Sequence, residues 1–219
     1  METNTKTRIV FVPTPHNPTG ALLSADEIMI LVREVPSNVL LLWDEAYYEF
    51  GRHAGGPETL PLFKLRKGPW FCTRTFSKAY GLAGIRVGYG IASSSDIAGA
   101  IRRCRPNYSV NAVALAGAVA ALNASEHSEN LLAHIARERD RLVSFLEQLG
   151  CQPLKSCANF VAVKTPVAAD HLAAALERSN IHLMSFHWEG TNGALRITIG
   201  DAGATDAVSV ALKLALQSC

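Results

Sequence analysis

The sequence has no apolar run of about 18 residues or more, the length that a helix needs to cross a membrane, so no membrane span is predicted. It also has little excess charge. The 21 Lys and Arg residues against 19 Asp and Glu residues give a formal net charge of +2, which is too small to indicate nucleic acid or a membrane surface as a partner. The first residues, METNTKTR, lack the apolar segment of a signal peptide.

Cysteine is present, but its spacing predicts no site. The five cysteines (72, 104, 151, 157 and 219) form no C-x-x-C pair and have no histidine-rich neighbour. An odd, scattered set predicts reduced thiols in a cytoplasmic protein, with neither a disulfide framework nor a zinc site. A hydrophobic content of 48% with 18% charged residues is ordinary for a globular protein with a real core.

Continuous apolar runs in the first half of the chain predict buried strands at residues 7–12, 39–43, 70–75 and 87–92. Ser24 and Glu27 have the spacing of a helix capping box, so a helix is predicted from there to about Val35, before Pro36. Residues 53–61, rich in Gly and Pro, are expected to form a surface loop. Apolar strands separated by a helix predict an α/β fold whose mostly parallel sheet is covered on both faces.

The second half predicts more helix. Helices are expected at residues 95–103, at 110–122, where the apolar pattern all round predicts a buried helix, and at 126–149, where Gly150 ends a long amphipathic pattern. Strands at 159–164, 181–186 and 195–199, with helices at 168–179 and 205–216, predict a smaller α+β unit. We therefore predict two domains, a large one at residues 1–125 and a small one at residues 126–219.

A lysine and an arginine follow the third predicted strand. Ser77 and Lys78 come directly after it, and a glycine-containing loop leads to Arg86 at the start of the fourth strand. A neutral lysine amine is a nucleophile for carbonyl groups, and an arginine can hold a phosphate with two parallel hydrogen bonds. The pairing suits a ligand that carries both an aldehyde and a phosphate, such as pyridoxal phosphate. The alternative is a solvated lysine and arginine beside a glycine loop.

Two further motifs precede this one, and the ordered set resembles a known family. The motifs are Asn-Pro-Thr-Gly at 17–20, Asp-Glu-Ala-Tyr at 44–47, Ser-Lys at 77–78 and Gly-x-x-Gly-x-Arg-x-Gly-Tyr at 81–89. In this order they resemble the class I/II, fold type I (aspartate aminotransferase-like) pyridoxal-phosphate enzymes, and most of all the histidinol-phosphate aminotransferase group. The resemblance runs from Thr7 onward. It implies the fold type I transferase fold, with a partial large domain and a smaller α+β C-terminal domain, and pyridoxal 5'-phosphate as cofactor.

The resemblance also implies which residues hold the cofactor ring. Lys78 would bind the cofactor as a Schiff base and, once released, move the proton at the substrate alpha carbon. Asp44 would hydrogen-bond the pyridine nitrogen, while Tyr47 and Asn17 would donate to the phenolate oxygen. Each has a plain structural alternative, because Asp44 could cap a helix, Tyr47 could belong to the core, and Asn17 begins a good turn sequence.

The phosphate and the substrate have their own implied residues. Arg86, Ser77 and Thr75 would bind the cofactor phosphate. Arg196, inside the apolar strand at 195–199, would bind the substrate alpha-carboxylate together with Asn17. An arginine within an apolar strand is costly unless it is paired, although an edge-strand arginine in solvent is the alternative. No metal site is expected.

Two departures from the family pattern change the expectation. The chain begins where the middle of a family member lies, so we expect a fragment, half of a split enzyme, or a short form completed by another copy. The predicted partner is a second copy in a homodimer or a complementing N-terminal chain. Met184 also stands where this group carries an arginine for the substrate phosphate, which favours a non-phosphorylated amino acid.

The predicted function is therefore a cytoplasmic pyridoxal-phosphate-dependent aminotransferase, or its C-terminal portion. It would transfer an amino group between an amino acid and a 2-oxo acid. One alternative is an amino-acid decarboxylase of the same family. The other is a non-catalytic aminotransferase-like fragment that acts as a binding or assembly module.

Overall fold

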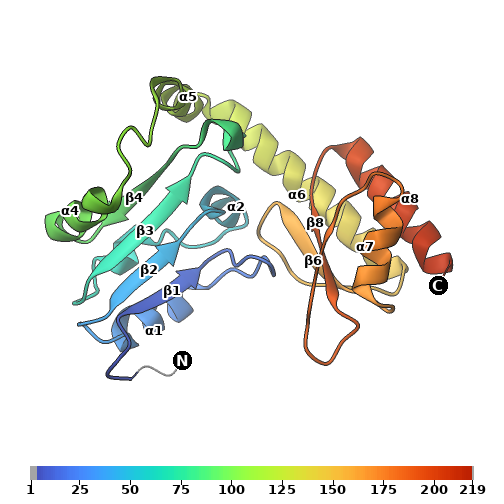
Figure 1. Ribbon diagram of the computed structural model, residues 1–219, viewed down its shortest axis with the longest axis horizontal. Coiled ribbons are helices and arrows are strands. Elements are labelled where there is room, and N and C mark those ends of the chain that lie inside the picture. Colours follow the sequence, from blue (N-terminus) through green and yellow to red (C-terminus); the bar gives the residue numbers. More distant parts are fainter. Residues whose placement is uncertain (1–3, 219) are drawn as a thin grey trace. The chain divides into compact units, whose positions relative to one another are not determined.

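The structure, a computed structural model, describes residues 4–218, which divide into two compact units (Figure 1). The first unit comprises the described chain up to His16 together with Leu22–Glu129. The second unit comprises Asn17–Ala21 and the described chain from Asn130 onward. The predicted domains, 1–125 and 126–219, remain a proposal, and Cys219 lies outside the described residues.

The first unit is built on a sheet of β1 (Ile9–Pro13), β2 (Leu40–Asp44), β3 (Trp70–Thr75) and β4 (Gly88–Ala92). The strand order is β1-β2-β3-β4, with β1, β2 and β3 mutually parallel and β4 antiparallel to β3. The sequence therefore predicted the mostly parallel sheet correctly. Because β1, β2 and β3 run in the same direction, their carboxyl ends lie at one edge of the sheet.

One face of this sheet is covered by helices, and we call it the covered face. α1 (Ala25–Glu34) and the short α3 (Leu60–Phe63) pack against it, and the rings of Trp43 and Phe63 meet edge to face at 5.0 Å. The buried core there comprises Val10, Ile28, Val32, Val35, Val39, Leu41, Trp43, Phe63, Trp70 and Cys72. Burial of this apolar area is the main stabilising term of the first unit.

The opposite face, which we call the open face, differs from expectation. Ile9 and Phe11, which alternate with the buried Val10, are 54% and 57% exposed. The prediction that both faces are covered is therefore wrong for the part of the chain that the structure describes. The reason is that α1 and α3 pack on the same face of the sheet.

α1 is fixed at both ends by side chains. At its start the capping box is confirmed, because Ser24 accepts a hydrogen bond from the Glu27 amide and the Glu27 carboxylate accepts one from the Ser24 amide at 2.8 Å. At its end lies Arg66, which is 8% exposed. Its guanidinium donates at 2.7–3.3 Å to the carbonyl oxygens of Val32, Val35, Pro36, Val39 and Pro69.

The connection between β2 and β3 contains two helices that the sequence analysis did not predict. α2 (Tyr48–His53) and α3 flank residues 54–59, so the loop expected at 53–61 is only partly a loop. Pro61 lies in the first turn of α3, where a proline costs no hydrogen bond. Reading Pro61 as the end of a loop was therefore wrong.

After β4 come α4 (Ser95–Cys104) and α5 (Ala112–Asn123). α5 was expected to be buried, and this is wrong, since Val113 and Leu115 are 72% and 60% exposed. Only its small-residue side, with Ala114 and Ala118, packs inward against a cluster that includes Phe76. An apolar composition predicted burial, but α5 contacts the rest of the first unit through one side only.

The second unit carries a sheet of β5 (Gln152–Pro153), β6 (Phe160–Lys164), β7 (Met184–Phe186) and β8 (Ala194–Thr198). The strand order is β5-β6-β8-β7, antiparallel throughout. α6 (Ser125–Gln148), α7 (Ala169–Glu177) and α8 (Ala202–Gln217) supply buried leucines such as Leu142, Leu172 and Leu212. Gly150, with φ of +74°, follows α6. β5 was not predicted, and β7 is shorter than the strand expected at 181–186.

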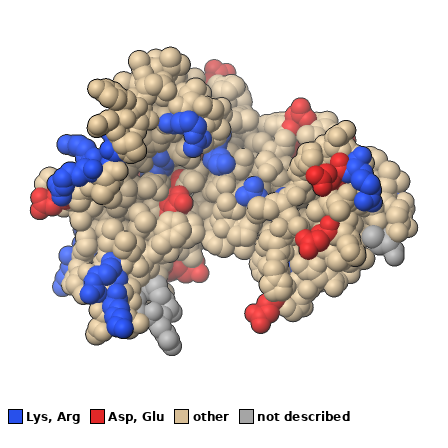
Figure 2. Space-filling view, viewed as in Figure 1, with Lys and Arg blue, Asp and Glu red and all other residues tan. Residues whose placement is uncertain are grey.

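Charged side chains are scattered over the visible face of each unit, with wide uncharged areas between them (Figure 2). Within residues 4–218, no helix is long and apolar enough to span a membrane. Cys72, Cys104, Cys151 and Cys157 are free thiols.

Candidate functional site

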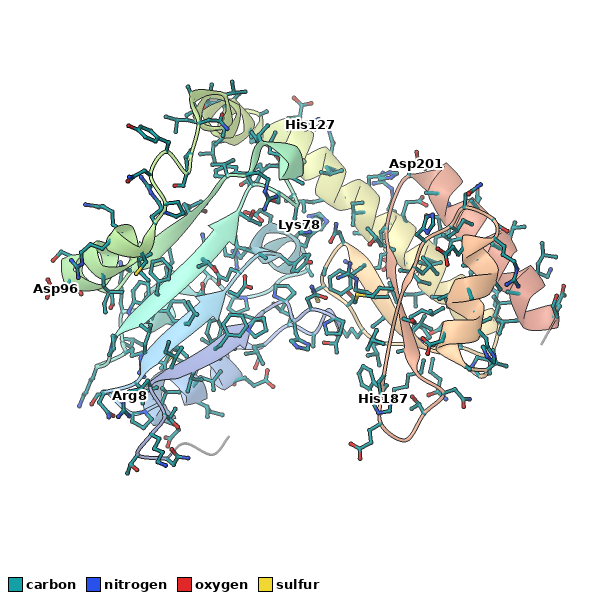
Figure 3. The ribbon with its side chains drawn as sticks, viewed as in Figure 1. Arg8, Lys78, Asp96, His127, His187 and Asp201 are labelled. Atoms are coloured by element: carbon teal, nitrogen blue, oxygen red, sulfur yellow. The ribbon has the colours of Figure 1, made fainter. Side chains whose placement is uncertain are left out.

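The carboxyl ends of β2 and β3 carry the first group of candidate residues. Asp44 is the last residue of β2, and Lys78 follows the end of β3 by one short turn. Figure 3 shows Lys78 beyond the carboxyl end of β3, with Arg8 at the opposite end of the sheet. Asp44 Oδ1 accepts a hydrogen bond from the Ala46 amide at 2.9 Å. The cap of α2 is Tyr47, without a side-chain bond, so the helix-cap alternative for Asp44 is wrong.

Lys78 and Tyr47 lie together. The Lys78 Nζ is 5.7 Å from the centroid of the Tyr47 ring, which is within the range of a cation–π contact. Lys78 is exposed, while Tyr47 is 6% exposed. Tyr47 is therefore a core residue whose ring also neighbours the lysine amine. A core position and a role as cofactor ligand, the two interpretations made from sequence, are thus compatible.

The segment from the end of β3 to the start of β4 holds the predicted phosphate ligands. Thr75 Oγ1 accepts a hydrogen bond from the Ser77 amide at 3.1 Å. Arg86 ends the 3₁₀ turn η1 (Ala83–Ile85) with φ of 58° and ψ of 59°, a left-handed conformation that is uncommon for a residue with a side chain. Its Nη1 donates to the Ala83 carbonyl at 2.7 Å. Gly81 has φ of +67°, and a Cβ there would meet no atom within 4 Å, so the loop is open at this point.

The second group lies in the second unit and consists of Asn17 and Arg196. Arg196 Nη1 donates to Asn17 Oδ1 at 2.9 Å, and the guanidinium carbon lies 4.9 Å from the centroid of the Phe160 ring. β8 lies between β6 and β7, so the alternative of an edge-strand arginine is wrong. Arg196 Nε is buried and has no hydrogen-bond partner within the described chain. A buried donor without an acceptor is costly.

The candidate residues thus fall into two groups, one in each unit. The structure brings Lys78 to Tyr47 in the first unit and Asn17 to Arg196 in the second. Their roles as cofactor and substrate ligands remain predictions. Across residues 4–218 no cluster of three or more His, Cys, Asp or Glu side chains could hold a metal ion.

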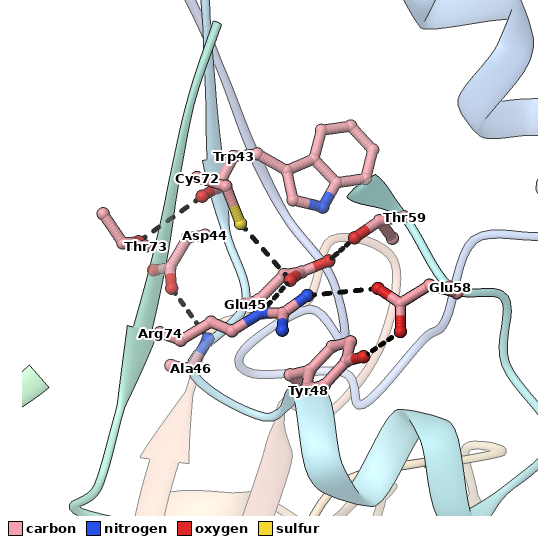
Figure 4. Close-up of polar contacts among 10 residues, drawn as sticks. All are labelled: Trp43, Asp44, Glu45, Ala46, Tyr48, Glu58, Thr59, Cys72, Thr73 and Arg74. Carbon is pink, nitrogen blue, oxygen red and sulfur yellow. Dashed lines mark hydrogen bonds and ion pairs between the residues drawn. The ribbon is translucent and has the colours of Figure 1, made fainter. Parts of the chain in front are cut away.

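A buried polar cluster that was not predicted from the sequence lies beside Asp44 (Figure 4). Glu45 is 1% exposed, and its carboxylate lies 2.7 Å from Arg74 Nε, a side chain that is 8% exposed. The same carboxylate accepts hydrogen bonds from the Thr59 hydroxyl and, at 3.3 Å, from the Cys72 thiol. A signal did exist, because Arg74 is an arginine within a predicted strand, the same observation that singled out Arg196.

The charges in this cluster shift its pKa values. Burial lowers the pKa of Arg74, but the Glu45 carboxylate outweighs that effect, so the net shift is upward. Burial, reinforced by the Glu45 charge, raises the pKa of the Cys72 thiol far above its ordinary value. Arg74 is therefore held as a cation and Cys72 as a neutral thiol.

A second layer surrounds Arg74. Its guanidinium carbon lies 3.4 Å from the centroid of the Tyr48 ring, and its Nη2 lies 3.4 Å from the Glu58 carboxylate. The Tyr48 hydroxyl donates to that carboxylate. Burial, followed by this hydrogen bond, raises the pKa of Tyr48 to about 12. Arg74 therefore has an anion on either side and an aromatic face against it.

The chain belongs to the class I and II aminotransferases, whose family model matches residues 1–212. It is 35% identical over 210 residues to a histidinol-phosphate aminotransferase of Caulobacter vibrioides, which covers 96% of this chain and 54% of that protein. It is 39% identical over 202 residues to an aromatic amino acid aminotransferase of Rhodococcus opacus, which covers 92% of this chain and 54% of that one. The chain thus spans about half the length of the curated relatives it matches.

A solved structure agrees with the fold. The histidinol-phosphate aminotransferase of Sinorhizobium meliloti, in complex with pyridoxal-5'-phosphate, superposes with a TM-score of 0.85 at 29% identity, over 96% of this chain and 57% of that one. The predicted α/β fold of the fold type I transferases is therefore confirmed, and so is the family that the motifs indicated.

Proposed function

We propose that this chain is a pyridoxal-phosphate-dependent aminotransferase, or the C-terminal portion of one, acting between an amino acid and a 2-oxo acid. The observation that carries the proposal is the exposed Lys78 amine beside Tyr47, after β3, with Asp44 at the end of the adjacent strand β2. Membership of the class I and II aminotransferases supports it.

The donor set fits pyridoxal phosphate. Lys78 offers an amine for the aldehyde, Asp44 a carboxylate for the pyridine nitrogen and Tyr47 a hydroxyl for the phenolate oxygen. Bound pyridoxal phosphate supplies a ring that takes up the electron pair of the substrate alpha carbon. Lys78 Nζ would anchor the cofactor and, once released, move the proton at that carbon. Asp44 Oδ1 is already fixed by the Ala46 amide, which orients the carboxylate for its role.

The phosphate would bind at the open loop. Arg86 presents a permanently charged guanidinium there, and the Thr75 and Ser77 hydroxyls stand at the end of β3. Thr75 Oγ1 accepts from the Ser77 amide, so its own hydrogen remains available to donate. Each bond from these groups to a charged phosphate contributes about 1.5–3 kcal/mol.

The substrate carboxylate would bind at Arg196. Nη1 already donates to Asn17, whereas the buried Nε has no acceptor in the described chain, so a carboxylate placed there would accept its hydrogen bond. Because Asn17 uses its Oδ1 as acceptor, its Nδ2 remains a donor for the cofactor phenolate.

The substrate side chain is proposed to be non-phosphorylated. Met184 on β7 is the cross-strand partner of Arg196 and is 43% exposed, so the position directly beside the arginine is apolar and accessible. An apolar neighbour does not compensate a phosphate, and it suits an apolar or aromatic side chain. The aromatic amino acid aminotransferase among the relatives is consistent with this proposal.

A partner completes the proposal. Parallel sheets are normally covered on both faces, yet Ile9 and Phe11 are more than half exposed on the open face. We propose that either a second copy, as in a homodimer, or a complementing N-terminal polypeptide covers this face. Free thiols at Cys72, Cys104 and Cys151 support a cytoplasmic location, where thiols stay reduced.

Spectral titration with pyridoxal phosphate tests the function. The chain, alone or with a complementing N-terminal polypeptide, should develop the visible absorption band of lysine-bound cofactor. Lys78→Ala should abolish the band, while Lys64→Ala, at an exposed lysine of the same unit, should keep it. A parent chain without the band under either condition would refute the proposal and favour the non-catalytic module.

A second experiment tests the substrate residues. Arg196→Ala should raise the KM for the amino acid at least tenfold and leave the cofactor titration largely intact, because the main bond that is lost is made to the substrate. Arg137→Ala, at an exposed arginine of the same unit, is the matched control. Equal losses in cofactor and substrate binding would remove Arg196 from this role. Recovery of carbon dioxide in place of a 2-oxo acid would select the decarboxylase.

A further inference from the structure

Neighbouring residues at the ends of β2 and β3 point to opposite faces of the sheet. Successive side chains of a strand alternate between faces, and Asp44 is in register with Thr73 on β3. Asp44, Thr73 and Thr75 therefore share the open face. Glu45 and Arg74 share the covered face. The candidate cofactor ligands and the buried ion pair are thus consecutive residues at the ends of the same two strands.

The ion pair stands where the backbone pairing of β2 and β3 ends. The ladder closes with Asp44 opposite Thr73, and the Glu45 amide donates to the Thr73 carbonyl at 2.9 Å. After this bond the chain turns into α2. From there the side-chain contact at 2.7 Å between Glu45 and Arg74 continues the connection between the two strands.

This contact is held from several directions. The Glu45 carboxylate also accepts bonds from Thr59 and Cys72, which leaves it little freedom to move. Arg74 is held in turn by the face of the Tyr48 ring. A buried ion pair whose other hydrogen-bonding groups are also satisfied holds a single geometry. Without this pair, the ends of β2 and β3 would fray.

We propose that Glu45 and Arg74 are positioning residues, and that their buried ion pair fixes Asp44 and Thr75 relative to each other so that pyridoxal phosphate can bind both. This inference rests on the proposed function. Because both side chains lie on the covered face, neither would touch a cofactor bound at the open face. Each acts through an adjacent residue of the chain, Glu45 through the preceding Asp44 and Arg74 through the following Thr75. Outer partners of this kind change ligand affinity by about 10- to 100-fold in metal sites.

Three variants separate positioning from stability. Glu45→Gln leaves Arg74 with only the exposed Glu58 carboxylate, and Arg74→Met leaves the buried Glu45 charge without a cation. Both variants should therefore destabilise the fold as well as weaken binding of the cofactor. The double variant Glu45→Gln/Arg74→Met removes both charges, so its stability should recover towards that of the parent. Its affinity for the cofactor should stay about 10-fold or more below that of the parent, since the ion pair no longer holds the strand ends.

Arg66→Lys is the matched control. Arg66 is also buried in the first unit, but it donates to Val39 and Pro69, just before the starts of β2 and β3. The variant Arg66→Lys should lower the stability of the fold and leave the affinity for the cofactor within about twofold of the parent. Affinity is measured with pyridoxal phosphate and, by calorimetry, with pyridoxamine phosphate. Pyridoxamine phosphate has no aldehyde, so its affinity reports the non-covalent contacts without the covalent bond to Lys78.

A readout independent of the cofactor follows from Cys72. Its thiol is buried and hydrogen-bonded to Glu45, so it should resist alkylation in the parent chain. In Arg74→Met, peptide mapping should show alkylation of Cys72 at least tenfold faster, and Arg66→Lys should change that rate little. Protection that is the same in Arg74→Met as in the parent would show that the pair does not hold the strand ends.

The outcomes distinguish failure of the proposed function from failure of the positioning role. A parent chain without cofactor binding refutes the proposed function and this inference with it. A parent chain that binds, with a double variant whose affinity recovers together with its stability, refutes the inference alone. A double variant that is stable but binds weakly supports the positioning role. The single variant Arg74→Lys, which keeps a cation beside Glu45, should then bind the cofactor more tightly than Arg74→Met does.

Discussion

Arg66 offers a direct test of how the first unit is stabilised. Arg66 is 8% exposed, and its guanidinium donates to five backbone carbonyl oxygens at the end of α1 and just before β2 and β3. Burial lowers the pKa of Arg66, but an arginine stays charged in proteins. Helix ends leave carbonyls that need such partners. In this protein one side chain supplies the partners for a helix end and two strand starts.

The magnitude follows from the bonds. A hydrogen bond to a charged group contributes about 1.5–3 kcal/mol, and bonds that share one guanidinium are not additive. The equivalent of two such bonds gives a loss of about 3–6 kcal/mol for Arg66→Met, against a typical total stability of about 5–15 kcal/mol. Arg66→Lys keeps the charge with three donors in place of five, so about 2 kcal/mol is expected.

Urea unfolding followed by tryptophan fluorescence provides the assay, because Trp43 and Trp70 lie in the same core. Arg33→Met, at an exposed arginine in the last turn of α1, is the control and should cost less than about 1 kcal/mol. If Arg66→Met fails to fold, Arg66→Lys still tests the reasoning. Stability of either Arg66 variant equal to that of Arg33→Met would refute it.

Three further predictions concern pH and backbone geometry. Ser24→Ala should cost about 1 kcal/mol. The Ser24 amide lowers the pKa of Glu27 from 4.5, so the capping box stabilises the fold above pH 4.5 and this contribution is lost as the pH falls through the lowered pKa. Glu27→Gln, which removes the titrating carboxylate, should therefore melt with less dependence on acid pH. Burial raises the pKa of Tyr48 from 10.0 to about 12, so its stabilisation is complete below pH 10 and lost towards pH 12; alkaline titration of Tyr48→Phe should lack one late phenol. Gly20 has φ of +78°, and an added Cβ would lie 2.0 Å from a serine hydroxyl, so Gly20→Ala should lower the melting temperature well beyond Gly55→Ala, where φ is +84° but nothing lies within 4 Å.

Local patterns predicted the elements well. The capping box at Ser24 and Glu27 forms because its partners are three residues apart, a spacing visible in any sequence. The polar residues at strand ends, such as Asp44 and Lys78, could be placed because parallel strands bring their carboxyl ends to one edge. Their roles rest on family resemblance, since a lysine after a strand has no chemistry of its own without a ligand.

Contacts across the fold could not be predicted in the same way. The pairing of Glu45 with Arg74 depends on the register of β2 against β3, which alternation along one strand does not reveal. The exposure of Val113 and Phe11 could not be predicted from the sequence either, because an apolar residue is buried only where another element covers it. The contact of Asn17 with Arg196 joins residues from opposite ends of the sequence.

The short segment Asn17–Ala21 has a practical consequence for dissecting this protein. The polypeptide leaves the first unit after His16, contributes five residues to the second, and returns at Leu22 before its final departure near Glu129. Producing residues 130–219 separately would omit the Gly20 carbonyl that the Cys157 amide contacts at 2.8 Å. Residues 130–219 produced separately therefore need the segment Asn17–Ala21 restored, either joined by a linker or added as a separate peptide.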